Sequence, residues 1–168
     1  MRIYEGSPRQ DFEEVLRSIG AHLDRRGMRE VLVAETETGY IVQGLVIESD
    51  SSQWGDQMGR GSKETLMLAD DDVGNFIDES LDHRGKAGDD MPDHYESALR
   101  VIGRWIDEQK PRDIFFFEQE GAYVLRLLRV DAAGFHHELV EFTKDDIADM
   151  IARAPALRRG ASGKAPQQ

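Results

Sequence analysis

Two pairs of glutamates stand at the ends of predicted β-strands, at corresponding places in the two halves of the chain. The pairs are Glu35 with Glu37, and Glu118 with Glu120. Side chains two residues apart on a strand point to the same face, so each pair could bind a divalent cation or act as an acid and a base. The structural interpretation, which we favour, is that these are solvated like charges at a hairpin end, balanced by Arg29 and Arg112.

A small-molecule site would require such charges to meet. If the two halves of the chain pack against each other, titratable side chains from both would line the seam between them. The expected set is Glu35, Glu118, Arg29, Arg112, Tyr40 and Tyr123. A closed cleft with these residues could bind a small molecule, or support an enzyme reaction that uses no familiar motif.

The segment 49–63 is a second candidate region, because it places two large apolar side chains, Trp54 and Met58, in a polar, glycine-rich context. Long loops in compact domains are often functional. Arg60 and Lys63 could hold an anion together with the neighbouring glycine amides, although the Gly-Lys-Ser/Thr end of a phosphate-binding loop is missing. A mobile insertion is the competing interpretation.

Other kinds of chemistry lack the residues that they require. The chain has no cysteine, which excludes disulfides, thiol catalysis and cysteine–metal sites. Its five histidines show no metal-binding spacing, and no serine-hydrolase or dinucleotide-binding motif is present. We therefore expect no metal and no cofactor.

The charge of the chain bears on its partners. Its 168 residues carry a net charge of −12. Nucleic-acid binding depends on Lys and Arg contacts with phosphates, so we expect no nucleic-acid partner. The sequence lacks a run of 18 apolar residues, which predicts no membrane span. The missing cysteines and the absence of a signal peptide's apolar core favour a cytoplasmic protein.

The sequence of the elements that must position these residues occurs twice in the chain. Residues 13–45 read again, without a gap, 83 positions later. The identical pairs are Glu13/Glu96, Leu16/Leu99, Arg17/Arg100, Ile19/Ile102, Gly20/Gly103, Asp24/Asp107, Arg29/Arg112, Glu35/Glu118, Glu37/Glu120, Tyr40/Tyr123 and Leu45/Leu128. An internal repeat predicts two copies of one structural unit.

Each copy opens with a predicted helix, because apolar residues recur three and four positions apart. Gly20 and Gly103 each cost such a helix about 1 kcal/mol relative to alanine, which indicates the close approach of another segment. Gly27 is expected to end the first helix, and Asp90 or Asp93 to cap the second copy's helix. The repeated aspartates at 24 and 107, arginines at 17 and 100, and tyrosines at 40 and 123 are expected to form a polar network rather than a site.

A hairpin follows each helix, with strands at 31–34 and 40–47 and again at 114–117 and 123–128. A third strand and a second helix follow at 66–68 and 73–77, and at 138–142 and 147–151, where Thr143 is a fair helix cap. The first copy holds nine extra residues, within 49–63. The predicted fold class is α+β: a tandem duplication of an α-β-β-β-α unit with antiparallel sheets packed against helices and a pseudo-twofold axis. The predicted boundaries are 1–81 for the first repeat, 82–92 for a linker, 93–154 for the second repeat and 155–168 for a disordered tail.

The α-β-β-β-α order is similar, in topology alone, to that of double-stranded RNA-binding domains. In that family, basic residues at the start of the second helix bind phosphates. Here the corresponding positions are acidic, with Asp70–Asp72 in the first copy and Asp145 and Asp146 in the second. Carboxylates there stabilise the start of a helix, so we do not expect RNA binding.

The predicted strands carry apolar residues on both faces. Every residue of 114–117 is apolar. In the first copy, the neighbouring residues Ile41 and Val42 of strand 40–47 point to opposite faces and are both apolar. A sheet that is covered by helices on one side needs only one apolar face, so we expect cover on the second face too. The two copies could pack on each other, or the whole chain could dimerise. We favour the intramolecular packing, because the second copy is already tethered.

These observations predict a non-enzymatic interaction or regulatory scaffold that binds a protein partner or forms a homodimer. Its surface would be an apolar sheet face, a helix groove or the 49–63 segment. In size and charge the chain is similar to small acidic secretion chaperones and immunity proteins. The alternative is a small-molecule binder or a motif-less enzyme with its site at the seam. A less favoured hypothesis is an acidic mimic of nucleic acid that occupies a basic partner.

Overall fold

The computed structural model describes residues 11–47, 61–82 and 91–156. Each half of the described chain contains a helix, three strands and a second helix. In the first half these are α1 (Phe12–Arg26), β1 (Met28–Glu35), β2 (Gly39–Ile47), β3 (Gly61–Ala69) and α2 (Val73–Leu81), with one 3-10 turn at Asp70–Asp72. In the second half they are α3 (Tyr95–Gln109), β4 (Asp113–Gln119), β5 (Ala122–Asp131), β6 (Gly134–Phe142) and α4 (Lys144–Arg153).

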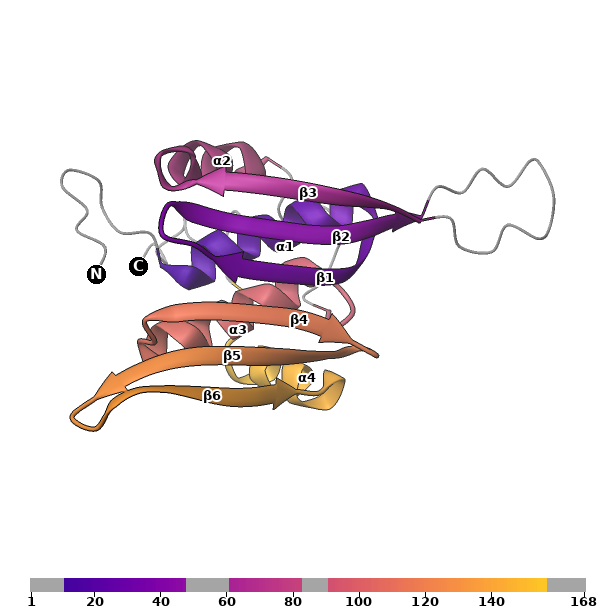
Figure 1. The fold of residues 1–168 in the computed structure, drawn as a ribbon. Helices are drawn as coiled ribbons and strands as arrows, with labels where there is room; N and C mark the ends of the chain where they lie inside the picture. The colour runs from indigo at the N-terminus through magenta and orange to yellow at the C-terminus, as the bar shows by residue number, and fades with distance from the viewer. Residues whose placement is uncertain (1–10, 48–60, 83–90, 157–168) are drawn as a thin grey trace, which may run out of the picture.

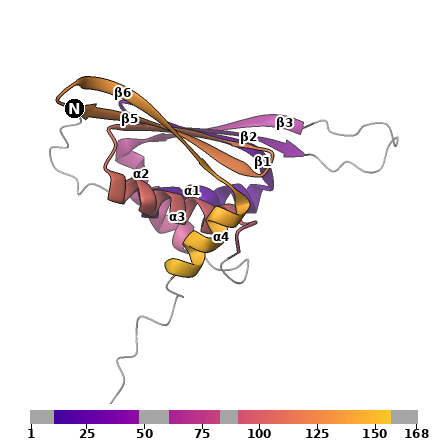
Figure 2. The ribbon, with the colours of Figure 1, turned by 90° about the horizontal axis from the view of Figure 1, so that it is seen from below.

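The six strands form one antiparallel sheet in the order β3-β2-β1-β4-β5-β6 (Figure 1). The two halves meet where β1 pairs with β4, through Leu32–Phe117, Val33–Phe116 and Ala34–Phe115. The expectation of separate sheets in the two repeats is therefore corrected to a single continuous sheet. All four helices of the described chain lie on the same side of it (Figure 2).

This arrangement also corrects the expectation that packing of one half on the other covers both sheet faces. The halves join edge to edge, so neither covers the strands of the other. Apolar side chains that point toward the helices form the core, and Phe116, Leu125 and Leu127 on β4 and β5 are fully buried there. We call the side without helices the open face.

Helices α1 and α3 pack closely, as the two helical glycines predicted. A Cβ atom at Gly20 would lie 2.4 Å from the carbonyl oxygen of Tyr95, and one at Gly103 would lie 2.5 Å from the carbonyl oxygen of Phe12. Each contact places the beginning of one helix against the later part of the other. The two helices are therefore antiparallel, and both glycines are required by backbone approach.

Each of these helices is capped by a carboxylate of the other. Asp24 accepts hydrogen bonds of 2.9 Å from the backbone N–H groups of Tyr95 and Glu96 at the start of α3. Asp107 accepts bonds of 2.9 and 3.1 Å from Phe12 and Glu13 at the start of α1. The predicted polar network is thus confirmed for the aspartates. The predicted local cap of α3 is wrong for Asp93, because His94 precedes the helix without a side-chain cap; Asp90 lies outside the described residues.

The repeated arginines also bridge the two halves. Arg17 pairs with Glu96 at 3.3 Å, and Arg100 pairs with Glu13 at the same distance. Arg100 is only 3% exposed, and it also donates a 2.6 Å bond to the carbonyl of Ala154 beyond α4. These ion pairs join α1 to α3 on the helical side of the molecule.

Several local predictions are confirmed. Gly27 ends α1 in the left-handed conformation, with φ of 65°. Thr143 caps α4, accepting from the Asp146 N–H while the Asp146 carboxylate accepts from the Thr143 N–H. The loop predicted at 49–63 is too long at its end, because Gly61, Ser62 and Lys63 pair with β2 and begin β3. Parts of the predicted linker (83–90) and tail (157–168) lie outside the described residues.

Candidate functional site on the open sheet face

The strand register places two rows of side chains across the open face. The first row runs from β3 to β6 through Met67, Ile41, Ala34, Phe115, Arg126 and Leu139. The second row contains Thr65, Gln43, Leu32, Phe117, Val124 and Glu141 in the same order. Directly paired residues on antiparallel strands share a face, so each row is a band of neighbouring side chains. Eight of these twelve side chains are apolar.

The outer strands carry the most exposed apolar side chains. Met67 on β3 is 75% exposed, and on β6 Leu139 is 71% and Phe135 is 68% exposed. The inner strands contribute the half-buried rings of Phe115 and Phe117, whose centroids lie 6.1 Å apart. The guanidinium of Arg126 lies 5.0 Å from the centroid of Phe115, so even the charged residue of the first row covers an aromatic ring.

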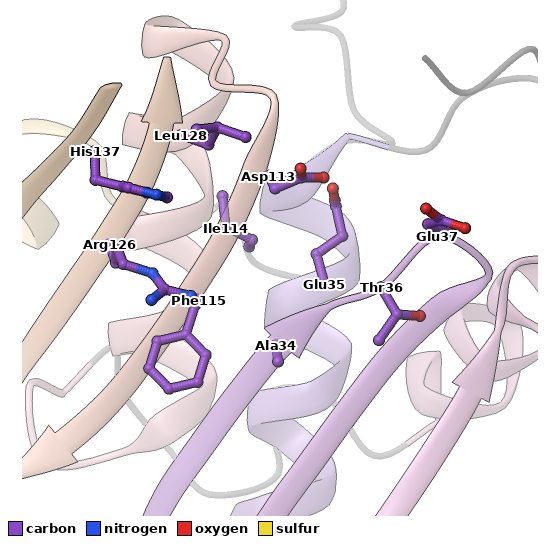
Figure 3. A pocket seen from close by; sticks show the side chains of 10 residues that line it. All are labelled: Ala34, Glu35, Thr36, Glu37, Asp113, Ile114, Phe115, Arg126, Leu128 and His137. Atoms are coloured by element: carbon purple, nitrogen blue, oxygen red, sulfur yellow. The ribbon is translucent and has the colours of Figure 1, made fainter. Parts of the chain in front are cut away.

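A notch interrupts the open face at the seam between the halves. Within the described residues, the ladder between β1 and β4 joins three residue pairs and stops at Ala34 and Phe115. Beyond that point a cavity of about 340 Å³ extends between the strand ends (Figure 3). Its lining residues are Ala34, Glu35, Thr36, Glu37, Asp113, Ile114, Phe115, Arg126, Leu128 and His137.

Charges of both signs line the notch. Figure 3 shows Glu35, Glu37 and Asp113 toward its upper right, with Arg126 and His137 on the other side. Such a lining suits a small molecule that carries both positive and negative groups. No group of three or more His, Asp or Glu side chains in the described ranges is arranged to hold a metal ion.

A different set of predicted site residues gathers on the helical side of the sheet. The Tyr95 hydroxyl donates a 2.6 Å hydrogen bond to Glu118, which also accepts from the Glu30 N–H at 3.1 Å. Burial, followed by this bond, raises the pKa of Tyr95, while the nearby Arg29 side chain opposes that rise. Burial and the Glu118 charge likewise raise the pKa of Tyr123.

Glu30 explains how Glu118 reaches this position. The β1 register shifts between Arg29 and Leu32, and Glu30 has a φ of 51°, as expected of an irregular residue in a strand. The Glu118 carboxylate takes the hydrogen bond of the Glu30 N–H at this irregularity. The group of Arg29, Glu118, Tyr95 and Tyr123 therefore joins the two halves and holds its tyrosines neutral, which is a structural task.

The structure brings together some of the seam residues that the sequence indicated and separates others. Glu35 lines the notch, whereas Arg29, Glu118 and Tyr123 belong to the cluster just described. Tyr40 is buried edge-on against Phe12, with centroids 6.5 Å apart. Arg112 lies 5.4 Å from the ring centroid of Phe135. The six residues therefore do not line one common cleft.

The residues proposed from segment 49–63 have mixed outcomes. Lys63 lies in β3, where it is exposed and pairs with Leu45. Trp54, Met58 and Arg60 lie outside the described residues. The sequence indicated that both faces of 114–117 are apolar, which includes Phe115 and Phe117 near the centre of the open face. It did not single out Arg126, or Met67 and Leu139 at the two ends of the row. The available signal was the apolar character of both strand faces.

Comparison of the chain with protein-family models, curated proteins and solved structures gave no match. Among the described helices, none is long and apolar enough to cross a membrane. The functional conclusion therefore depends on the geometry of the open face and the notch.

Proposed function

We propose that this protein is a non-enzymatic interaction scaffold that binds a protein surface through the open face of its sheet. The observation that carries the proposal is the apolar band across six strands, with Met67 and Leu139 at its two ends 75% and 71% exposed. A contiguous apolar surface of this kind is costly to leave in water and typically marks a protein contact.

The organisation of the chain supports a scaffold rather than an enzyme. We infer that its two halves arose by duplication of one α-β-β-β-α unit, and that they are related by a pseudo-twofold axis at the seam. The reciprocal caps of Asp24 and Asp107 and the matching backbone contacts of Gly20 and Gly103 support this inference. Duplication then serves to build a sheet broad enough to dock a protein.

Photo-cross-linking in the native host tests the proposal. The photoreactive residue p-benzoylphenylalanine replaces Phe135 or Leu139 on the open face, and Glu108 on the exposed side of α3 as a control. We expect discrete adducts from the two open-face positions and none from position 108. Identical adducts from all three positions, or no adduct from the open face, would contradict the proposal.

The notch favours a second candidate function, the binding of a small molecule at the seam. Its basis is the cavity of about 340 Å³ with carboxylates on one side and Arg126 on the other. A thermal-shift screen with amino acids, polyamines and dicarboxylates tests it. A genuine ligand would raise the melting temperature of the native protein but not that of the Arg126→Gln or Asp113→Asn variants; equal shifts in all three would exclude the notch.

A further inference from the structure

We propose that the partner of the open face is a second copy of this chain, packed sheet against sheet about a twofold axis that runs along the strands. This inference rests on the proposed function, because it names the occupant of the same surface. Three properties of the open face support it: its area, the distribution of its side-chain volume, and the placement of its charges.

The area of the open face matches the requirement of a stable dimer. Neighbouring strands lie about 4.8 Å apart and each residue advances about 3.4 Å, so six strands of about seven residues cover roughly 700 Å². A standard protein interface buries about 800 Å² on each partner. Contact between two copies of this face therefore supplies close to the area of a standard interface, and the helices need not contribute to it.

Beside the seam, the open face carries larger side chains on β4 than on β1. In the first row Ala34 of β1 lies beside Phe115 of β4, and in the second row Leu32 lies beside Phe117. A twofold axis along the strands, placed at the seam, exchanges the β1 and β4 positions. It would therefore set each phenylalanine of one copy against the smaller residue of the other, as close sheet packing requires.

The same axis brings opposite charges together at the outer strands. Lys63 of β3 lies one step beyond the second row, and Glu141 of β6 ends that row. Because the axis places β3 of one copy over β6 of the other, Lys63 would approach the Glu141 of the second copy, twice in each dimer. Within the two rows Arg126 is the only charged residue besides Glu141, and the carboxylates of the notch lie beyond the rows.

An axis that runs across the strands would fit less well. It would place each strand over its own copy, so Phe115 and Phe117 would meet the same pair of rings while Ala34 would meet only Leu32. The contact would be overfilled at β4 and loose at β1, which is costly in a packed interface.

Sedimentation equilibrium of the full chain tests whether the dimer forms through this face. We expect the native protein to dimerise, and Leu139→Glu to weaken dimerisation by about 100-fold because it places a charge on an apolar surface that the dimer would bury. Leu81→Glu, at the end of α2 on the helical side, is the matched control and should leave dimerisation unchanged. Circular dichroism of each variant confirms that it is folded.

Cross-linking tests the axis, and the absence of native cysteine makes it direct. Proteins with Met67→Cys and with Leu139→Cys are treated with a short bismaleimide, separately and as a mixture. We expect a cross-linked dimer from the mixture alone, since the axis places position 67 of one copy near position 139 of the other. Efficient cross-linking of the Met67→Cys protein to itself would overturn the proposed axis.

Charge reversal gives an independent readout. Lys63→Glu alone and Glu141→Lys alone should each weaken dimerisation, and a mixture of the two variants should restore it by forming the mixed dimer. A native protein that stays monomeric at high concentration would overturn the second-copy inference, while photo-adducts to another protein at positions 135 and 139 would still support the proposed function. A dimer that Leu139→Glu does not weaken would also overturn the inference.

Discussion

The two faces of the sheet differ in what the halves of the chain share. On the helical side, the shared residues make the joint: Gly20 and Gly103 admit backbone contact, and Asp24 and Asp107 cap the opposite helices. On the open face, equivalent positions have diverged, so that Leu32 corresponds to Phe115 and Gln43 to Arg126 in the repeat. The residues shared by the two halves therefore stabilise the joint between them. The positions that have diverged lie on the open face, the surface that we propose binds a partner.

Adjacent phenylalanines on β4 provide the largest expected contrast between the faces. Phe116 points to the helices and is fully buried, whereas its neighbour Phe117 lies half-buried on the open face. We expect Phe116→Ala to lower the free energy of unfolding by about 3–5 kcal/mol, through lost burial and the cavity left behind. Phe117→Ala should cost the monomer about 1 kcal/mol, because part of its ring is already in water.

Urea unfolding at a concentration that keeps the chain monomeric measures both values. Comparable losses for the two variants would mean that the open face is part of the folding core, and would remove the distinction between the faces. A loss of stability that appears only when the chain dimerises, and only for Phe117→Ala, would strengthen the distinction between the two faces.

The helical glycines test whether the two halves contribute equally to the joint. Gly20→Ala and Gly103→Ala each place a methyl group within 2.6 Å of a backbone atom of the other helix. We expect each to destabilise the fold by about 1–3 kcal/mol despite the better helix propensity of alanine. Thermal unfolding monitored by circular dichroism measures the effect. Gly74→Ala in α2, where nothing lies within 4 Å of the added group, is the control and should not destabilise.

The reciprocal caps give the next largest effect. Asp24→Ala removes the acceptor for two N–H groups at the start of α3, and Asp107→Ala does the same for α1. We expect a loss of about 1 kcal/mol from each substitution, the usual value of a helix cap. Hydrogen exchange should locate the change at the start of the opposite helix. A change confined to the helix that carries the aspartate would contradict capping across the joint.

The sequence was sufficient for the elements but not for their assembly. Apolar periodicity located the helices and strands, and Gly27 and Thr143 marked real helix ends. The joining of β1 to β4 could not be predicted, because backbone hydrogen bonds at a strand edge are common to all residue types. The same limit hid the cap of α3, since Asp24 lies 71 residues from Tyr95 in the chain.

The candidate site was indicated only in part. The sequence indicated a second apolar face of the sheet, through the apolar residues on both sides of β2 and the wholly apolar run in β4. In the structure this second face is the open face, which no helix covers. Its outer members, Met67 and Leu139, could not be recognised before the strand order placed them at opposite ends of one row. The notch depends on where the β1–β4 ladder stops, which leaves no pattern in the sequence.

The last expected effect is no larger than that of the caps and concerns two tyrosines on the helical side of the sheet, Tyr95 at the start of α3 and Tyr123 on β5. Burial, and then Glu118, raises the pKa of Tyr95 and Tyr123 above the ordinary value of 10.0. Above pH 10 the unfolded chain therefore loses phenolic protons that the folded chain keeps, so the free energy of unfolding should fall as the pH rises further. Tyr95→Phe removes one such proton and the hydroxyl bond to Glu118, and should cost about 1 kcal/mol at neutral pH.

The same variant should lose less stability between neutral and alkaline pH than the native chain does, so the two curves should converge. Urea unfolding across this pH range measures the free energy of unfolding, and the ultraviolet absorbance of tyrosinate measures the ionisation of the tyrosines. Parallel curves would show that Tyr95 ionises while folded and is accessible to water. The first half natively carries Phe12 at the position that corresponds to Tyr95, so it already packs this corner without a hydroxyl. A small cost for Tyr95→Phe would then mean that packing, rather than the bond to Glu118, holds both corners of the joint.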